Sequence, residues 1–157
     1  MNITHLICYF LLLLPNVEMT YSYTNPLITI EAMSIKSDLE LIELTKLVNS
    51  EAWFENSKGK IEVLGVVIAR LKDERFPNNI IDVIHDKGEF DGVSAPLFIY
   101  TQETYDLLKE AYLKQYTSKY LFYYNPEFST DRKFIKWVNK NYTLTRKIGN
   151  HKFHGKS

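Results

Sequence analysis

Two glutamates, Glu51 and Glu55, are four residues apart in the stretch VNSEAWFENSKG. A carboxylic acid that is shielded from water keeps its proton to higher pH, and such an acid can protonate a leaving group at neutral pH. General acid catalysis is therefore one interpretation of this pair. The other interpretation is structural: one glutamate pairs with Arg70 or a lysine and closes the end of a helix. Spacing alone does not choose between the two.

The helix that must position both glutamates is predicted over residues 39–54, with Ser37 or Asp38 as the N-cap. Apolar residues recur in it at spacings of three and four, which is the pattern of one buried helix face. These residues are Leu41, Leu44, Val48 and Ala52. With 100° per residue, Glu55 falls inside this apolar stripe and Glu51 lies at its edge. Both carboxylates are therefore expected to point toward the core or toward a cleft cut into it.

The remaining segments predict an α+β domain, mostly helical with a small antiparallel sheet. Residues 58–72 are apolar nearly all round, which is typical of a central buried helix. Four further elements are expected: a helix at 102–116, a β-rich segment at 119–126, a short helix at 131–141 and a closing hairpin at 143–155, with Gly149-Asn150 near its turn.

Length and composition describe one ordinary globular domain. The chain has 157 residues, 45% of them hydrophobic and 24% charged, which suffices for a real core and argues against disorder. Nineteen basic residues balance nineteen acidic ones, so the composition does not indicate a nucleic-acid binder. Cys8 is the only cysteine, which excludes a disulfide within the chain, and the four histidines form no HExxH motif. A zinc peptidase is therefore not expected.

The N-terminus carries a nine-residue apolar run at 6–14, too short to span a bilayer but typical of the central region of a secretory signal. Thr20 and Ser22 supply small residues for a cleavage site. Against this interpretation, no Lys or Arg precedes Lys36. Residues 1–22 are accordingly predicted to be a signal peptide, the alternative being a buried N-terminal helix or a membrane-associating segment.

From about residue 42 to the end, the chain resembles the SleB-like cell wall hydrolase family, which includes the catalytic domains of spore-cortex-lytic enzymes. EAWFE at 51–55 occupies the place of the Glu-Ala-Arg-Gly-Glu motif of that family. Further blocks follow in the family's order: a glycine and apolar helix from Gly59 to Arg70, RFPNNIIDVIHDKGEF at 75–90, LFYYNP at 121–126 and IGNHKF at 148–153. Two departures stand out, because Trp53-Phe54 replaces Arg-Gly and residues 101–119 do not align.

This resemblance implies a lysozyme-like fold, related to resuscitation-promoting factors and lytic transglycosylases, over residues 37–157, with a linker at 23–36. It implies Glu51 as the catalytic acid and Glu55 in a supporting role. The expected substrate-binding residues are Phe90, Tyr123, Tyr124, Asn125 and His151, and a structural role for His151 in fixing the last strand is an equal alternative. Neither metal nor cofactor is expected. The implied partner is the glycan strand of peptidoglycan, and the protein is expected to be a monomer. The expected location is the envelope or the exterior of the cell, or the protein is a phage-encoded lysin that acts on the wall.

The implied reaction is cleavage of the β-1,4 bond between N-acetylmuramic acid and N-acetylglucosamine, in the manner of a lytic transglycosylase that forms 1,6-anhydro-muramic ends. A single acid suits this chemistry, since the muramic C6 hydroxyl attacks from within the same sugar. One alternative is a muramidase that uses water, with Glu55 or Asp91 as the second carboxylate. Another is a non-catalytic peptidoglycan-binding or structural protein of an envelope or virion, which the Trp53-Phe54 replacement favours.

Overall fold

The computed structural model describes residues 26–156, with side chains described from Lys36 onward except that of Asp91. The predicted signal peptide at 1–22 lies outside the described residues. Contacts divide the chain into two units, Met1–Met33 and Ser34–Ser157. The architecture reported below is that of the second unit. Within residues 26–156, no helix is both long enough and apolar enough to cross a membrane.

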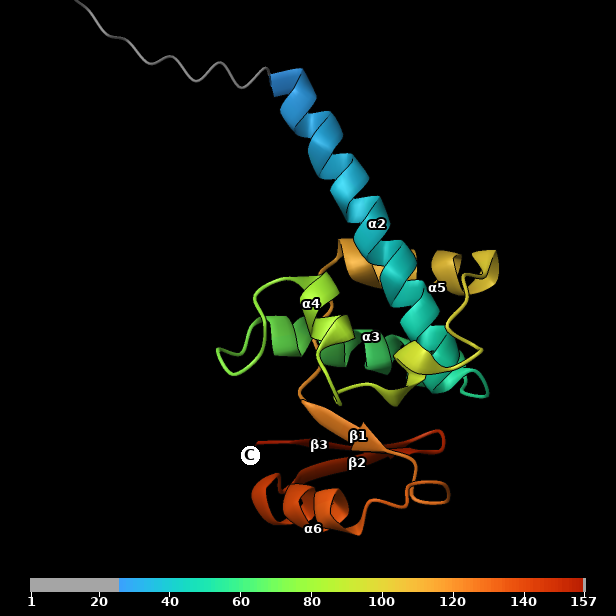
Figure 1. Ribbon diagram of the computed structural model, residues 1–157, viewed down its shortest axis with the longest axis vertical. Coiled ribbons are helices and arrows are strands. Elements are labelled where there is room, and N and C mark those ends of the chain that lie inside the picture. Colours follow the sequence, from blue (N-terminus) through green and yellow to red (C-terminus); the bar gives the residue numbers. More distant parts are fainter. Residues whose placement is uncertain (1–25, 157) are drawn as a thin grey trace, which may run out of the picture. The chain divides into compact units, whose positions relative to one another are not determined.

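The domain is an α+β structure in which helices precede a small sheet and one further helix interrupts the strands (Figure 1). The elements are α2 (Pro26–Ala52), α3 (Ser57–Leu71), α4 (Ile80–His85), the 3-10 helix η1 (Asp91–Ser94), α5 (Gln102–Leu113), β1 (Phe122–Tyr124), α6 (Arg132–Asn141), β2 (Leu144–Ile148) and β3 (His151–Gly155). The predicted fold class is therefore confirmed.

Three antiparallel strands form the sheet in the order β1-β3-β2. In Figure 1 the sheet lies between the helices α2–α5 and helix α6. Two apolar clusters correspond to its two faces, because successive side chains of a strand point to opposite sides. Phe153 belongs to the large helical core, whereas Phe122 packs with Val138 and Tyr142 beneath α6.

The predicted central helix is α3, whose residues are buried from Glu62 to Arg70. Asn56 caps it, since its side chain accepts a hydrogen bond from the backbone N–H of Gly59 at 3.0 Å. Glu62 is a buried carboxylate on this helix, and it accepts hydrogen bonds from the hydroxyls of Tyr116 and Ser118. These bonds attach the segment after α5 to the centre of the domain.

The closing hairpin forms where it was predicted. Gly149 adopts a positive φ of 58° in the turn between β2 and β3, a conformation that residues with a side chain rarely adopt. In the register, Phe153 of β3 pairs with Tyr123 of β1 on one side and with Arg146 of β2 on the other. Strand β3 thus pairs with β2 through the hairpin and with β1 on its other side, so β3 is the central strand and β1 is an edge strand.

Both predicted ends of the first helix were wrong. α2 begins at Pro26, so Ser37 and Asp38 lie inside the helix and do not cap it, and the predicted linker is helical from Pro26 onward. Proline favours the first helical position because its φ is preset and its missing N–H is not needed there. The helix ends at Ala52, whose carbonyl accepts a turn hydrogen bond from the N–H of Glu55. Glu55 consequently lies in the turn that precedes α3, not on the helix.

Candidate active site

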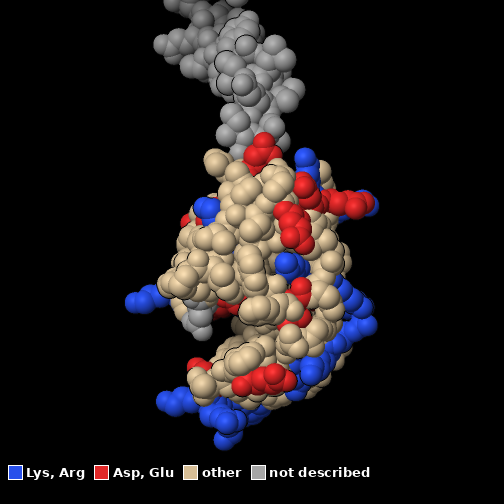
Figure 2. All heavy atoms as spheres, turned by 90° about the vertical axis from the view of Figure 1, so that its right-hand side faces the viewer, with Lys and Arg blue, Asp and Glu red and all other residues tan. Residues whose placement is uncertain are grey.

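A cleft of about 1010 Å³ separates the helical part of the domain from the sheet and α6. Figure 2 shows it as a hollow in the surface between the two parts. The end of α2, the 3-10 helix η1 at Gly92, strand β1 and the loop that follows β1 all contribute to its walls. Glu51 and Glu55 both line it, as the sequence predicts.

Glu51 lies in the last turn of α2, is half-buried, and has its carboxylate held at both oxygens. Its Oε1 accepts a hydrogen bond from the backbone N–H of Gly92 at 2.7 Å, and its Oε2 accepts one from the hydroxyl of Tyr123 at 3.1 Å. A Cβ at position 92 would come within 2.5 Å of Glu51 Oε1. Glycine is therefore required at position 92 for this close approach between backbone and carboxylate.

The hydroxyl of Tyr123 keeps its proton and donates it in a hydrogen bond to Glu51. Burial raises the pKa of Tyr123 well above its usual value of 10, and the neighbouring Glu51 carboxylate raises it further. The ring is fixed by Phe153, at a centroid distance of 5.4 Å, and by the edge of His151 at 5.1 Å. Tyr123 thus reaches Glu51 from the sheet with an orientation that the core determines.

Glu55 is engaged differently, because its side chain is only 3% exposed and serves the hairpin. Both of its oxygens accept the backbone N–H of Asn150, at 3.0 and 3.1 Å, and Oε1 lies 3.2 Å from Nδ1 of His151. A Cβ at Gly149 would overlap Oε2 of Glu55. The carboxylate therefore locks the turn between β2 and β3 against the start of α3.

His151 is buried beside Glu55 and Tyr123. Burial lowers the pKa of His151 below its usual 6.5, although the Glu55 carboxylate opposes this effect. A neutral imidazole in this position completes the contact between the hairpin and Glu55. This placement favours the structural alternative for His151, even though the residue also lines the cleft.

Arg70 forms the base of the cleft and is 3% exposed. Its Nε donates to the carbonyl of Leu121 at 2.9 Å, and its Nη1 lies 3.0 Å from Oε2 of Glu89. The guanidinium also stacks on Phe90, with its carbon 4.6 Å from the ring centroid. Arg70 therefore forms an ion pair with Glu89 at the base of the cleft.

Phe90 lies elsewhere than the sequence predicts. It is 7% exposed, it packs between Arg70 and Tyr123, and it is not among the described residues that line the cleft. A stacking surface for a sugar must be open to the cleft, whereas the ring of Phe90 is covered by the guanidinium of Arg70. The residue follows a loop, where neither period 2 nor period 3.6 predicts which way a side chain points.

Tyr124 and Asn125 do line the cleft. Tyr124 stacks on His154 with a centroid distance of 5.4 Å, on the α6 side of the sheet, whereas Tyr123 points to the helical side. Asn125 shapes the following loop, since its Oδ1 accepts a hydrogen bond from the N–H of Glu127 at 3.0 Å. The predicted binding residues are thus brought together around β1, with Phe90 as the exception.

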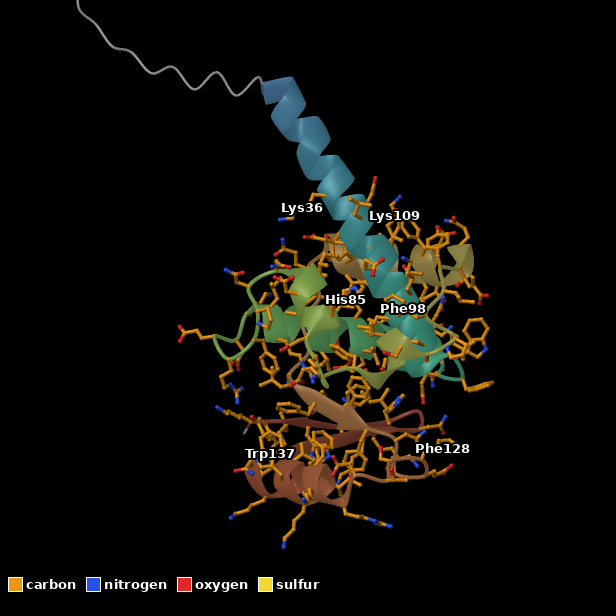
Figure 3. All side chains as sticks on the ribbon, in the orientation of Figure 1. Lys36, His85, Phe98, Lys109, Phe128 and Trp137 are labelled. Carbon is orange, nitrogen blue, oxygen red and sulfur yellow. The ribbon has the colours of Figure 1, made fainter. Side chains whose placement is uncertain are left out.

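Four exposed aromatic side chains at the cleft were not predicted as binding residues. They are Trp53, Phe54, Phe128 and Trp137, with exposed fractions of 38, 87, 78 and 45%. In Figure 3, Phe128 lies in the loop after β1 and Trp137 on α6. Trp53 and Phe54 lie on the opposite wall, directly after α2. The sequence signals were the Trp53-Phe54 replacement and the aromatic residue Phe128, two positions after Pro126.

The described part of the chain contains no group of three or more His, Cys, Asp and Glu side chains that could hold a metal ion. The Glu51 carboxylate is instead hydrogen-bonded to Gly92 and Tyr123, and Arg70 is paired with Glu89. What the arrangement offers chemically is one half-buried carboxyl group, oriented by two donors, at the wall of an aromatic-rimmed cleft.

Two solved structures share the fold of this domain. The catalytic domain of the Bacillus cereus SleB protein is 22% identical, with a TM-score of 0.61 over 73% of this chain and 88% of that one. The catalytic domain of the germination-specific lytic transglycosylase SleB from Bacillus anthracis is 19% identical, with a TM-score of 0.61 over 87% and 99%. The fold is therefore lysozyme-like.

The family follows from the sequence itself, since residues 54–154 match the model of the Cell Wall Hydrolase family. The chain belongs to the cell wall hydrolase family, and the resemblance inferred from its motifs is confirmed. The matched region contains Glu55 and begins shortly after Glu51. Among curated proteins, no match to this chain is found.

Proposed function

We propose that this protein cleaves the β-1,4 bond between N-acetylmuramic acid and N-acetylglucosamine in peptidoglycan, as a lytic transglycosylase with Glu51 as its acid. The observation that carries the proposal is the position of Glu51: its carboxyl group lies at the cleft wall between the N–H of Gly92 and the hydroxyl of Tyr123. Membership of the cell wall hydrolase family and the fold of SleB support the choice of substrate.

The first step is protonation of the leaving group. A glycan strand bound in the cleft excludes water from Glu51, and the loss of water favours the neutral acid. The proton of Glu51 then passes to the glycosidic oxygen as the bond from that oxygen to the anomeric carbon breaks. Gly92 and Tyr123 keep the carboxyl oriented, because each bond anchors a different oxygen.

The second step closes a ring within the muramic acid. Its C6 hydroxyl attacks the anomeric carbon, and the Glu51 carboxylate takes the proton that this hydroxyl releases. The product carries a 1,6-anhydro bond, and Glu51 returns to its protonated form. Because the nucleophile belongs to the same sugar, its effective concentration is high and the protein need not supply one.

The other described carboxylates at the cleft are engaged, which supports this scheme over a muramidase that needs a second free carboxylate. Glu55 holds the N–H of Asn150, and Glu89 pairs with Arg70. Asp131 caps α6 through the N–H groups of two residues. The side chain of Asp91, the remaining candidate for the water-using reaction, lies outside the described side chains.

The exposed aromatic residues at the cleft would bind the sugar rings. Trp53 and Phe54 lie on the wall that carries Glu51, and Phe128 and Trp137 lie on the wall formed by the loop after β1 and by α6. The apolar face of a pyranose stacks on an aromatic plane, and an exposed ring can do so without rearranging the core. A wall on each side of Glu51 would grip the glycan strand across the bond to be cleaved.

The proposed site of action is the cell envelope, reached through the predicted signal peptide at 1–22. The family name and the proposed substrate agree with that location. A phage lysin that reaches the same wall from within an infected cell would perform the same reaction.

The test is digestion of purified peptidoglycan, with mass spectrometry of the released fragments. We expect 1,6-anhydro-muramic ends from the native protein and their loss in Glu51→Gln. Glu62→Gln is the matched control, since this buried carboxylate belongs to α3 and does not line the cleft. Hydrated reducing ends would indicate a water-using muramidase. Wall binding without any release would indicate a non-catalytic protein.

A further inference from the structure

The domain is divided into an acidic and a basic part, although the whole chain has no net charge. Residues 34–118 contain ten Lys and Arg against fifteen Asp and Glu, a net charge of −5. Residues 119–156 contain nine Lys and Arg against two Asp and Glu, a net charge of +7. Figure 2 shows this division, with Lys and Arg gathered over the lower part of the molecule.

A row of lysines on α6 is the centre of the basic part. Lys133, Lys136 and Lys140 are spaced by three and four residues, which places them on one face of the helix. All three are exposed, whereas Val138, on the other side of the helix, is fully buried against the sheet. The lysine row therefore faces solvent because the apolar face of α6 is already used.

Strand β2 extends this surface. The neighbouring side chains of Arg146 and Lys147 point to opposite faces of the sheet. In the register, Lys147 is opposite Lys152 of β3. Lys152 donates a hydrogen bond to Asn139 of α6 at 2.9 Å, so these two lysines lie on the α6 side of the sheet. We call the surface formed by the three helix lysines, Lys147 and Lys152 the basic face.

The charges of the basic face are not neutralised within the described residues. Among the side chains that the structure describes, none forms an ion pair within 4 Å with any of its five lysines, whereas pairs such as Lys46 with Glu43 and Arg70 with Glu89 occur in the acidic part. Like charges gathered without counter-charges repel one another and raise the free energy of the folded state. A polyanion that replaces small counterions at such a surface relieves this repulsion and releases those ions.

We propose that the basic face binds a phosphate-bearing anionic polymer of the cell wall and so retains the enzyme at its substrate. The choice of a wall polymer as the partner rests on the proposed function, whereas the charge distribution is observed independently of that function. α6 contributes to both surfaces, because Phe134 and Trp137 line the cleft while the lysine row faces away from the sheet. A polymer held on the basic face would therefore keep the cleft beside the glycan strands without occupying it.

A membrane surface fits the basic face less well. A helix that lies in a membrane interface buries an apolar face between the lipids. In α6 that face packs toward Phe122 and Tyr142, and the exposed ring of Trp137 lines the cleft, so the lysine row itself presents only charged groups to a partner. An extended polyanion needs no apolar insertion, and its binding is purely electrostatic.

The experiment measures sedimentation of the full chain with purified cell walls, in the Glu51→Gln background so that no digestion occurs. Walls are compared before and after removal of their phosphodiester polymers with hydrofluoric acid. The test variant is Lys133→Glu/Lys136→Glu/Lys140→Glu. The matched control is Lys58→Glu/Lys87→Glu/Lys109→Glu, which changes the net charge equally at exposed lysines of the acidic part.

We expect binding to fall by at least about tenfold between roughly 50 and 200 mM salt, since several ionic contacts are lost together. The test variant should bind at least about tenfold more weakly than the control variant at the lower salt concentration. Extracted walls should retain neither variant strongly. Equal binding by the two variants, or unchanged binding to extracted walls, would overturn the proposal, as would stronger binding to anionic lipid vesicles or DNA than to walls.

The outcome is separate from that of the proposed reaction. Restoring Glu51 in the test variant should leave cleavage of short soluble glycan fragments unchanged, because the lysine row does not line the cleft. Loss of that cleavage would overturn the assignment of the basic face to retention alone. Absence of cleavage in the native protein would instead contradict the proposed function and leave the binding measurement interpretable.

Discussion

Glu51 and Glu55 are four residues apart, yet they belong to different kinds of site. Glu51 is half-buried at the cleft, where one backbone N–H and one tyrosine hydroxyl orient it from outside its own helix. Glu55 is nearly enclosed, its oxygens accept the N–H of Asn150, and Oε1 lies 3.2 Å from Nδ1 of His151. The comparison shows that residue type and spacing alone do not distinguish a reactive carboxyl from a structural one.

The difference comes from where α2 ends. Its last turn keeps Glu51 on the helix, while the chain after Ala52 turns and carries Glu55 inward toward the hairpin. A carboxylate that replaces all of its water by fixed donors stabilises the fold but has no oxygen free for a substrate. One that keeps part of its exposure can still meet a ligand. The experiments below are ordered from the largest expected effect to the smallest.

Removing the proposed acid should separate the two glutamates most clearly. We expect Glu51→Gln to lower the rate of peptidoglycan cleavage by about 10²–10⁴-fold, the range typical of general acid–base catalysis. Folded Glu55→Gln should lose far less, because Glu55 is expected to act only through the hairpin. Release of soluble fragments by purified variants measures both rates. Comparable losses in the two variants would remove the distinction.

Stability should show the reverse order. Glu55→Gln is expected to lower the free energy of unfolding by about 1–3 kcal/mol, since it weakens the charge-assisted bonds from the N–H of Asn150 to a carboxylate that is only 3% exposed. Glu51→Gln should change it by less than about 1 kcal/mol, because its carboxyl is half-exposed. Urea denaturation followed by circular dichroism measures both. Glu62→Gln, at a second buried carboxylate, should resemble Glu55→Gln.

Tyr123→Phe would sharpen the account of how Glu51 is oriented. The substitution removes the donor to Oε2 and keeps the ring that packs on Phe153. We expect kcat to fall by about tenfold, equivalent to one hydrogen bond to a charged group, with little change in KM. An unchanged kcat, together with an unchanged pH profile, would mean that this bond does not orient the acid.

Acidification should destabilise the folded state through His151, which lies against Glu55, and through His154 on the other face of β3. Burial lowers the pKa of His151 and His154 below 6.5, so the folded state binds these protons less tightly than the unfolded state. Stability is therefore full above pH 6.5 and falls as the pH drops below it, by at most about 1.4 kcal/mol per pH unit for each histidine. Thermal melts across this range measure the slope. His151→Gln should reduce the slope, and an unchanged slope would contradict this role.

Much of the fold could be predicted from local patterns. The buried helix α3, the amphipathic α5 and the hairpin turn at Gly149 follow from apolar periodicity and turn chemistry, which act over a few residues. The start of α2 was missed because periodicity was weighed and the proline at its first position was not. The order β1-β3-β2 depends on residues about thirty positions apart and was not predictable from such patterns.

By itself, the sequence determined the class of fold, the family and the presence of two candidate carboxyl groups, because these depend on residue types in a fixed order. Only the tertiary structure decided their roles, since the N–H of Gly92, the hydroxyl of Tyr123 and the turn at Asn150 come from distant segments. It also showed that Phe90 is enclosed and that a chain of zero net charge has a basic face. The physical reason is common to both: burial and the electrostatic environment depend on which segments meet in space.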